Sequence, residues 1–404
     1  MEQEYNAVKK LLSEHKCKIT FTEFPTLFSL IREKTSISSS IDIYKILLAL
    51  MCKKPIIDDP EKINIPSKFK EIHNEFEYLC NVPVVEQRSP EWYLMRHNMI
   101  TASSCAEALG QNKYKKREQF LFEKCLPDPP FQKNIDTHHG CKYEPIATMI
   151  YEEVYDTRVK EFGLIPHPDI SFIGASPDGI STCFSKKNPN KFSSKYGVML
   201  EIKCPRTRKI KKVGNINGDI VPVYYHVQVQ IQLEVCKLNH CDFWQCTLKE
   251  YETREEWLFD ERKPLPIDEE GTQKIENVNV LKGAIIELLP LVPFANNEAC
   301  LFDAKYIYPP TVNMTCSEYE HWVNFEISNM YKIHPELYKK YVFHKIIYWK
   351  LDVVHNQTVE RDKEWFTEVK PKLEKFWEEV LYYRNSPDEI KKIMKPKPKS
   401  FDDL

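Results

Sequence analysis

Two short segments of the sequence hold the side chains best suited to catalysis. Asp178 stands in the run Ser-Pro-Asp-Gly, and Glu201 and Lys203 follow it after residues 179–200. Side chains two positions apart on a strand point to the same face of a sheet, so a strand here places Glu201 and Lys203 together. If the strand before Asp178 is its neighbour, two carboxylates and one ammonium group converge.

Such a set of groups suits metal-assisted hydrolysis. Mg²⁺ prefers oxygen ligands, and when bound it polarises a phosphoryl oxygen and lowers the pKa of its bound water. A lysine beside the metal can orient the attacking water or offset negative charge. We therefore expect phosphodiester hydrolysis with Mg²⁺, or Mn²⁺ as an alternative because an oxygen-rich site accepts either ion. The three residues alone also fit a solvated turn and an edge strand, since so short a pattern often arises by chance.

The elements that must position these residues lie in the middle of the chain. Short apolar or alternating runs predict strands at residues 163–166, 171–175, 197–203, 242–248 and 254–259. A turn at residues 168–169 joins the first two strands. Residues 224–235 predict a helix, although their β-branched side chains leave a strand as the rival. The Ser-, Asn- and Lys-rich residues 184–196 predict a loop.

Both ends of the chain have helical patterns. Residues 277–289 and 361–383 are the clearest helices, and Pro371 is expected to kink or split the second. The apolar stripe of that helix predicts core packing. These patterns divide the chain into an accessory helical domain at 1–85, a catalytic core at 86–262, a helical extension that completes the core at 263–390 and a basic, disordered tail at 391–404.

Composition excludes several classes of protein. The chain has 404 residues, of which 42% are hydrophobic and only 10 are glycine. G-x-G-x-x-G, G-x-x-x-x-G-K-[ST], H-E-x-x-H and G-x-S-x-G are all absent, which argues against nucleotide-binding, zinc-protease and common hydrolase chemistry. No apolar run approaches the roughly 18 residues of a membrane span, and the charged start lacks a signal-peptide core. We expect a soluble intracellular protein with no membrane partner, whose 13 cysteines are reduced.

Charge is unevenly distributed along the chain. The net charge is −2, yet six of the ten residues at 203–212 are Lys or Arg. Such a stretch can contact phosphates, although a solvated face has the same composition.

Four blocks follow one another in a characteristic order between about residues 88 and 248. They are Arg88-Ser-x-Glu-Trp92-x-x-x-Arg96 with Ile100-Thr-Ala-Ser103, then Gly140-x-x-x-Glu144-Pro145, then Ser176-Pro-Asp178-Gly179 with Glu201-Ile-Lys203, and last Tyr225-x-x-Gln228-x-Gln230. In this order they resemble the YqaJ-type viral recombinases, a family of PD-(D/E)XK nucleases that includes the phage lambda exonuclease. A weaker likeness extends to residues 359–377.

The resemblance implies an α/β fold, with an α+β core of the restriction-endonuclease type. Its central mixed sheet is flanked by helices, and helical additions stand at both ends. It also implies a Mg²⁺-dependent deoxyribonuclease that degrades duplex DNA 5′→3′ from its ends in viral recombination or replication, with a single-strand annealing protein as a partner. A viral protein of this kind acts in the host cytoplasm or nucleus. The helical additions put a ring-shaped trimer in doubt, so the oligomeric state stays open.

The same resemblance assigns roles in the catalytic centre. Asp178 and Glu201 are the main metal ligands, joined by the carbonyl of Ile202, and Lys203 is the catalytic lysine. Glu144 is implied as a further ligand, although the helical pattern alone places it roughly opposite the apolar stripe, facing solvent.

Further residues are implied to serve the catalytic centre or to bind DNA. Gln228 reaches the active site, and Tyr225 lies one turn before it. In a helix Gln230 faces away from Gln228, as a surface glutamine would, whereas Gln232 shares its face. The resemblance implies that Arg96 and Ser103 hold the 5′-phosphate of the DNA end. Tyr225, together with Arg206 and Arg208 of the basic stretch, is also predicted to contact DNA.

Other readings share parts of this pattern. The superfamily includes endonucleases and RNA-active enzymes, and no motif here reports contact with a 2′-hydroxyl. A catalytically idle DNA-binding recombination factor is a second alternative. Cys236, Cys241 and Cys246 suggest an iron–sulfur nuclease, but buried structural cysteines fit their predicted elements better.

The long basic loop at 184–196 is hypothesised to touch DNA, so shortening it should weaken DNA binding without preventing folding.

Overall fold

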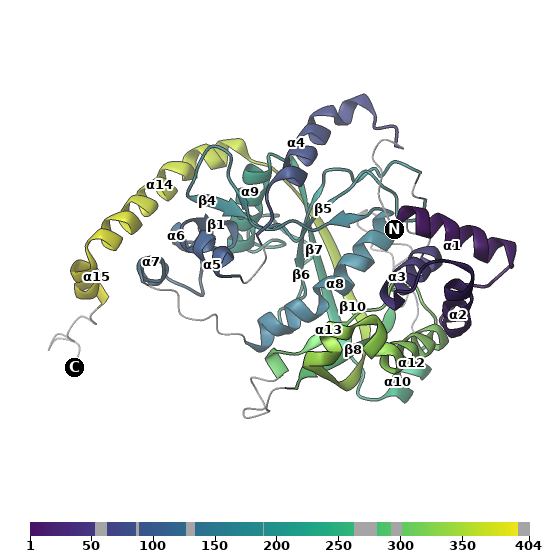
Figure 1. Ribbon diagram of the computed structural model, residues 1–404. Helices are drawn as coiled ribbons and strands as arrows, with labels where there is room; N and C mark the ends of the chain where they lie inside the picture. Colours follow the sequence, from purple (N-terminus) through teal and green to yellow (C-terminus); the bar gives the residue numbers. More distant parts are fainter. Residues whose placement is uncertain are drawn as a thin grey trace.

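A seven-stranded mixed sheet forms the centre of the protein (Figure 1). The computed structural model describes residues 1–52, 63–85, 89–126, 134–188, 190–261, 281–291 and 301–394. The strand order is β2-β5-β6-β7-β10-β8-β9. Its strands are β2 (Val159–Lys160), β5 (Gly179–Ser181), β6 (Met199–Lys203), β7 (His240–Glu250), β8 (Lys282–Pro290), β9 (Lys305–Ile307) and β10 (Tyr341–Glu360). Helices flank this sheet, so the predicted fold class is confirmed.

Strand directions explain how the sheet is connected. β6 and β7 are parallel, with α9 (Val223–Cys236) as the crossover between them, because two parallel neighbours need a long connection. The other pairs in this sheet are antiparallel. A separate three-stranded sheet has the order β1-β4-β3 and consists of β1 (Ile100–Thr101), β3 (Ile165–Pro166) and β4 (Ile173–Ala175). The predicted pair of short strands is thus β3 and β4.

The two faces of β6 pack against different helices. Leu200 and Ile202 face the apolar cluster that includes Ile146 and Ile150 of α8 (Ile135–Tyr155). Met199 instead belongs to the cluster formed with α9 and α14 (Lys363–Asn385). Glu201 and Lys203 alternate with Leu200 and Ile202, so they lie on the α9 side of the strand.

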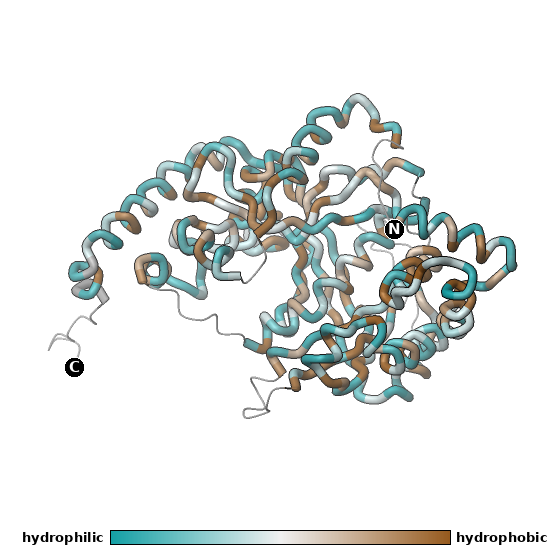
Figure 2. The backbone as a smooth tube through the Cα atoms, viewed as in Figure 1, coloured by the Kyte–Doolittle hydropathy of each residue, from teal (hydrophilic) through white to brown (hydrophobic). Residues whose placement is uncertain are grey.

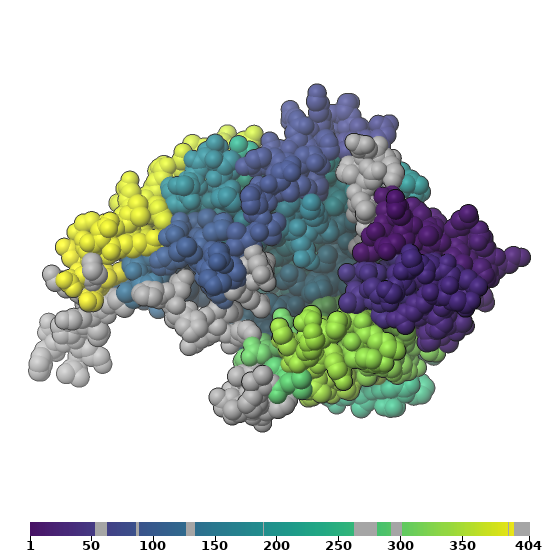
Figure 3. Space-filling model, viewed as in Figure 1, coloured from purple at the N-terminus to yellow at the C-terminus, as the bar shows by residue number. Residues whose placement is uncertain are grey.

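A third apolar cluster lies at the opposite end of the molecule from α14 (Figures 1 and 3). It joins α1 (Glu2–Glu14), α2 (Phe24–Lys34) and α3 (Ser40–Met51) to β8 and α12 (Cys316–Ile333). In contrast, α4 (Lys70–Asn81) contributes Phe76 and Leu79 to the cluster around α9. The described helices of residues 1–85 therefore pack on two different parts of the molecule, and the predicted domain boundaries stay a prediction.

The remaining helices are short or cover the outside of the molecule. They are α5 (Pro90–His97), α6 (Cys105–Ala108), α7 (Arg117–Cys125), α10 (Arg254–Phe259), α13 (Pro335–Lys340) and α15 (Pro387–Met394), with 3-10 turns η2 (Ser67–Phe69) and η3 (Ala102–Ser104). The long outer helix α14 alternates between hydrophilic and hydrophobic segments, as Figure 2 shows. Its start is capped by Asp362, which accepts a hydrogen bond from the backbone of Trp365. No helix in the described part of the chain is long and apolar enough to cross a membrane.

Several predicted elements are wrong. Residues 254–259 form the helix α10, whose start is capped by Thr253. The described part of the predicted helix 277–289 is the strand β8, which is buried along nearly its whole length. An apolar run buried on both sides does not reveal its period, so sequence pattern cannot separate a core strand from a core helix. The predicted helical extension 263–390 accordingly includes β8, β9 and β10.

Two further predictions concern the C-terminal end. α14 runs through Pro371 without being split. The helix α15 continues to Met394, so the predicted disordered tail does not begin at residue 391; residues 395–404 lie outside the described residues. Cys236, Cys241 and Cys246 are buried, as predicted.

Candidate active site

The predicted catalytic residues meet where β5 and β6 pair. Asp178 directly precedes β5, and Gly179 is the register partner of Leu200 on β6. The Oδ2 atom of Asp178 accepts a hydrogen bond from the backbone N–H of Ile202 at 2.6 Å. The strand that follows Asp178 is therefore the neighbour of the strand that carries Glu201 and Lys203, as the predicted site requires.

Glu201 is the most enclosed of these groups, with 1% of its surface exposed. Its Oε1 atom accepts hydrogen bonds from Lys203 and from the Nε2 atom of Gln228, the latter at 2.7 Å. Its Oε2 atom accepts one from the Nε2 atom of Gln232, also at 2.7 Å. Three donors from two elements hold this carboxylate in one orientation.

Glu144 of α8 completes a group of acidic side chains that we call the carboxylate cluster: Glu144, Asp178 and Glu201. Burial raises the pKa of Glu144; Lys203 opposes this rise, and Glu201 adds to it. The side chain thus lies within electrostatic range of the β6 residues, and the solvent-facing orientation suggested by the helical pattern is wrong.

The cluster holds more negative charge than its lysine offsets. Burial, followed by the charges of Glu201 and Glu144, raises the pKa of Asp178 well above its usual value. Burial would lower the pKa of Lys203, but the charges of Glu201 and Asp178 outweigh burial and raise it. Carboxylates that push one another toward the neutral form are typical of a site made to receive a cation.

Ligand geometry for a metal is not formed in this arrangement. Within the described residues, no group of three or more His, Cys, Asp or Glu side chains is placed to hold a metal ion. Both oxygens of Glu201 accept hydrogen bonds, and Oδ2 of Asp178 faces the backbone of β6. The oxygen donors nevertheless fit a hard divalent cation in type.

The sequence around this site matches a known family. Residues 91–239 match the YqaJ-like viral recombinase domain. These residues form a YqaJ-like domain. The match contains the whole carboxylate cluster, Lys203 and all of α9, and it confirms the resemblance inferred from the four blocks.

Comparison of the whole chain finds one viral relative and several exonuclease structures. An uncharacterized protein of Acanthamoeba polyphaga mimivirus is 37% identical over 340 residues, which are 84% of this chain and 60% of that protein. An alkaline exonuclease from Laribacter hongkongensis has 16% identity and a TM-score of 0.37, with 76% of this chain and 100% of that chain covered. A phage-related exonuclease from Haemophilus somnus has 11% identity and a TM-score of 0.35, with 72% and 96% covered.

Helix α9 of the YqaJ-like domain presents glutamines to two different places. Gln228 and Gln232 bind Glu201, whereas Gln230 donates to the carbonyl of Glu360 at 2.8 Å and accepts from the backbone of Asp362 at 2.8 Å. The expected direction of Gln230 is confirmed, but it is buried and not a surface residue. Gln232 is a member of the site that the four blocks did not assign; its spacing of four from Gln228 was the available signal.

Tyr225 and Arg208 lie near Lys203, the predicted catalytic lysine. The Nζ atom of Lys203 is 4.6 Å from the ring centroid of Tyr225, and the guanidinium of Arg208 is 6.0 Å from the same centroid. Arg208 also donates to the side chain of Gln245 at 3.0 Å. The structure therefore brings these two predicted DNA-binding residues to the cluster.

The other predicted DNA contacts are held by their own neighbours. Arg96 lies over the ring of Trp92 at 4.7 Å, and Arg206 donates to Asp136 at 2.7 Å. Ser103 is exposed in η3, which belongs to the segment packed beside α9, and its hydroxyl is 3.3 Å from that of Thr101. Arg88, in the first block, lies outside the described residues. The 5′-phosphate role of Arg96 and Ser103 stays a prediction.

The basic loop at 184–196 is fastened to the end of α8. Lys186 forms ion pairs with Glu152 and Glu153 at 3.8 and 3.4 Å, and Lys195 forms one with buried Asp242 at 2.5 Å. Two of its four lysines thus have structural partners, and DNA contact by this loop stays a prediction.

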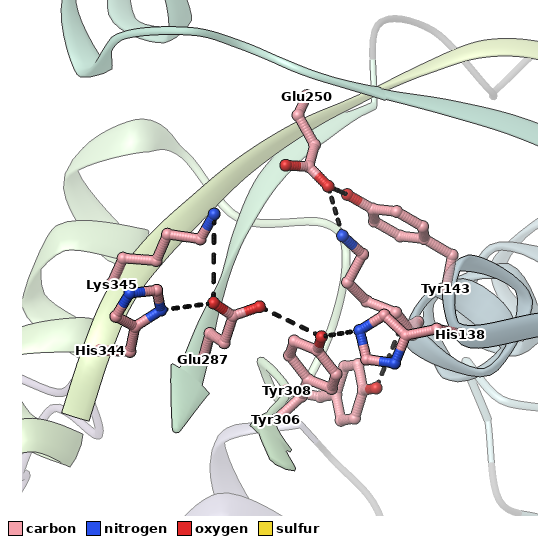
Figure 4. Close-up of polar contacts among 9 residues, drawn as sticks. His138, Tyr143, Glu250, Glu287, Tyr306, Tyr308, His344 and Lys345 are labelled. Carbon is pink, nitrogen blue, oxygen red and sulfur yellow. Dashed lines mark hydrogen bonds and ion pairs between the residues drawn. The ribbon is translucent and has the colours of Figure 1, made fainter. Parts of the chain in front are cut away.

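A second polar group, the α8–β8 network, includes residues of α8 between His138 and Tyr143, just before Glu144 (Figure 4). Buried Glu287 of β8 accepts from Tyr306 at 3.1 Å, and its Oε1 lies 2.7 Å from the Nδ1 of His344. Tyr306 also contacts His138 at 2.8 Å. The other members of the network are Lys142, Tyr143, Glu250, Tyr308 and Lys345.

Proposed function

We propose that this chain is a Mg²⁺-dependent deoxyribonuclease that hydrolyses duplex DNA 5′→3′ from its ends. The observation that carries the proposal is the carboxylate cluster around Lys203 inside a YqaJ-like domain. Burial and mutual repulsion raise the pKa values of Asp178 and Glu144, and a divalent cation would relieve that repulsion.

Each residue of the site has a distinct role in this reaction. Glu144, Asp178, Glu201 and the carbonyl of Ile202 would hold Mg²⁺, which polarises the phosphate and lowers the pKa of its bound water. Lys203 orients the attacking water and offsets negative charge on the phosphate. Gln228 and Gln232 keep the Glu201 carboxylate in place through their 2.7 Å hydrogen bonds.

Binding of the DNA end is the finer part of the proposal. Arg96 and Ser103 hold the 5′-phosphate, and Tyr225, Arg206 and Arg208 contact the strand near the cluster. The biological setting would be viral recombination or replication, with a single-strand annealing protein as a partner. The chain spans 60% of the length of its mimivirus relative, so the activity of a complete protein belongs to this proposal as well.

The test uses linear duplex DNA with a 5′-phosphate and a 3′ label, incubated with Mg²⁺ or with EDTA. Parallel samples contain closed circles, 5′-hydroxyl ends, matched RNA and the variant Asp178→Asn. We expect resection of linear DNA only, abolished by EDTA and by Asp178→Asn. Circles cut as fast as linear DNA would identify an endonuclease, preferential cleavage of RNA would overturn the DNA assignment, and DNA binding without cleavage in either metal would identify an accessory factor.

A further inference from the structure

Three tyrosine rings form a continuous row that starts at Lys203 and ends at the surface. The rings of Tyr225 and Tyr224 have centroids 4.3 Å apart, and those of Tyr224 and Tyr114 are 5.6 Å apart in an edge-to-face arrangement. Phe243 of β7 supports the inner end, 5.8 Å from Tyr225. We call Tyr114, Tyr224 and Tyr225 the tyrosine row.

The outer ring is positioned by its own loop and not by burial. Tyr114 is 70% exposed, so its ring contributes little to the packing of the core. Its backbone N–H donates to Asn112 at 2.9 Å, and Asn112 in turn donates to the buried Glu107 at 3.1 Å. Tyr114 and Tyr224 also share a side-chain hydrogen bond. A large aromatic ring is thus held in the open, where a ligand can reach it.

Cations accompany the row from end to end. Lys113 lies 4.9 Å from the Tyr114 ring centroid, and Lys203 and Arg208 lie 4.6 and 6.0 Å from that of Tyr225. Aromatic faces beside positive groups are the features with which proteins bind unpaired nucleotides: bases stack on the rings and phosphates meet the cations. Base pairs inside a duplex are covered on both faces by their neighbours, so unpaired bases offer far more free surface to such a row than a fully paired end does.

We propose that the tyrosine row is a stacking platform for unpaired bases at the end of the DNA strand that enters the carboxylate cluster, with Lys113 and Arg208 contacting its phosphates. The proposal rests on the proposed nuclease function and names the form of its substrate, which is a frayed end. Tyr114, Tyr224 and Lys113 thereby join the site.

Binding of frayed DNA in EDTA tests the row without any cleavage. The probe is a duplex with a 5′-phosphate and three unpaired terminal nucleotides that include 2-aminopurine, whose fluorescence falls when the base stacks. We expect the wild-type protein to quench the probe and to bind it more tightly than a fully paired duplex. Tyr114→Ala and Tyr224→Ala should each weaken binding of the frayed end by about 5- to 100-fold and reduce the quenching.

Conservative and distant variants separate stacking from folding. Tyr114→Trp and Tyr114→Phe keep an aromatic face, so they should retain quenching. The matched control is Tyr331→Ala, which removes another exposed tyrosine that has a lysine and a second tyrosine beside it: Tyr331 is 52% exposed, with Lys332 5.1 Å and the ring of Tyr338 6.2 Å from its centroid. This control should bind as the wild type does, because α12 lies at the opposite end of the molecule from α14 and its neighbours.

The outcomes distinguish this proposal from the nuclease proposal. If wild-type protein resects DNA but Tyr114→Ala and Tyr224→Ala bind frayed ends normally with full quenching, the stacking platform is wrong and the nuclease stands. If tyrosine-dependent quenching occurs and no DNA is cleaved in Mg²⁺ or Mn²⁺, the platform stands without the nuclease. The platform is not a DNA site if wild-type protein fails to bind the frayed probe. It is also not a DNA site if the protein binds the matched RNA more tightly than the DNA.

Discussion

The carboxylate cluster and the α8–β8 network both enclose acidic side chains along the first half of α8, but they balance the charge differently. In the network, Glu250 meets Lys142 and the hydroxyl of Tyr143. Burial would raise the pKa of Glu250, yet these partners outweigh it and the pKa is lowered. In the cluster, burial and neighbouring carboxylates raise the pKa values of Asp178 and Glu144.

This difference separates a group that stabilises the fold from one that is prepared for a ligand. A carboxylate with its own cation and donors is satisfied without further help. Carboxylates that share a lysine repel one another, and that repulsion persists until a cation arrives or a proton binds. Substitutions should therefore reduce activity in the cluster and stability in the network.

The largest contrast is expected from Asp178→Asn. This change removes a proposed metal ligand, so cleavage should fall by at least about 10³-fold, which corresponds to several kcal/mol of lost metal assistance. The Asn side chain can still accept from the N–H of Ile202, and one repulsive charge is gone, so the thermal unfolding temperature without metal should not fall. Gel assays of cleavage and calorimetry measure the two effects. Equal loss of activity in Glu250→Gln, with its fold intact, would break the comparison.

The paired variants Gln232→Ala and Gln230→Ala test the contrast within one helix. Gln232 positions Glu201, so its loss should reduce kcat by about 10- to 100-fold and raise the Mg²⁺ concentration needed for half-maximal activity. Gln230 ties α9 to the backbone at residues 360–362, so its loss should lower the free energy of unfolding by about 1–3 kcal/mol. Steady-state kinetics and urea denaturation measure the pair. If Gln230→Ala reduced kcat and Gln232→Ala reduced only stability, the proposed role of Gln232 in holding Glu201 would be wrong.

Lys142→Met tests the network itself. The change leaves Glu250 charged and without its cation, which should lower the free energy of unfolding. Because 37% of the Glu250 side chain is exposed to solvent, screening limits the expected loss to about 1 kcal/mol. Urea denaturation at neutral pH measures it. Cleavage per folded molecule should remain within about twofold of the wild-type rate. A large loss of cleavage would show that the network contributes to catalysis and not only to stability.

An effect of similar size concerns pH. Burial, followed by the charge of Lys142, lowers the pKa of His139 to about 4 from 6.5. Between those values the unfolded chain binds more protons than the folded one, so stability falls as the pH drops from about 6.5 to about 4. The full shift corresponds to about 3 kcal/mol, and partial exposure of the ring reduces the expected loss to about 1 kcal/mol.

His139→Phe checks the origin of this pH dependence. Phenylalanine keeps the edge-to-face contact that His139 makes with Tyr143 at 4.8 Å and cannot bind a proton. Urea denaturation at pH 7 and pH 4.5 should therefore show a smaller difference in the variant than in the wild type. An unchanged difference would assign the pH dependence to other groups.

The sequence by itself indicated the YqaJ-like domain and proposed the residues of the candidate site. Asp178, Glu201 and Lys203 are recognisable because period-2 alternation on β6 and the Pro-Asp-Gly turn are local features. The order of the four blocks identified the YqaJ-like domain, which the match to residues 91–239 confirms. Local patterns also predicted β3, β4, β6 and β7, whereas for α9 they left a strand as the rival until the structure showed a helix.

Only the tertiary structure decided which distant groups meet these residues. The pattern of residues 277–289 predicts a helix where the structure has the strand β8, because burial on both faces hides the period of the strand. Gln232 reaches Glu201 from another element, and Tyr114 meets Tyr224 from a loop far away in the chain. The orientation of Glu144 was set by the packing of α8 against β6, which overrode its local helical pattern. Contacts between distant segments depend on how whole elements pack, and local residue patterns carry no record of that packing.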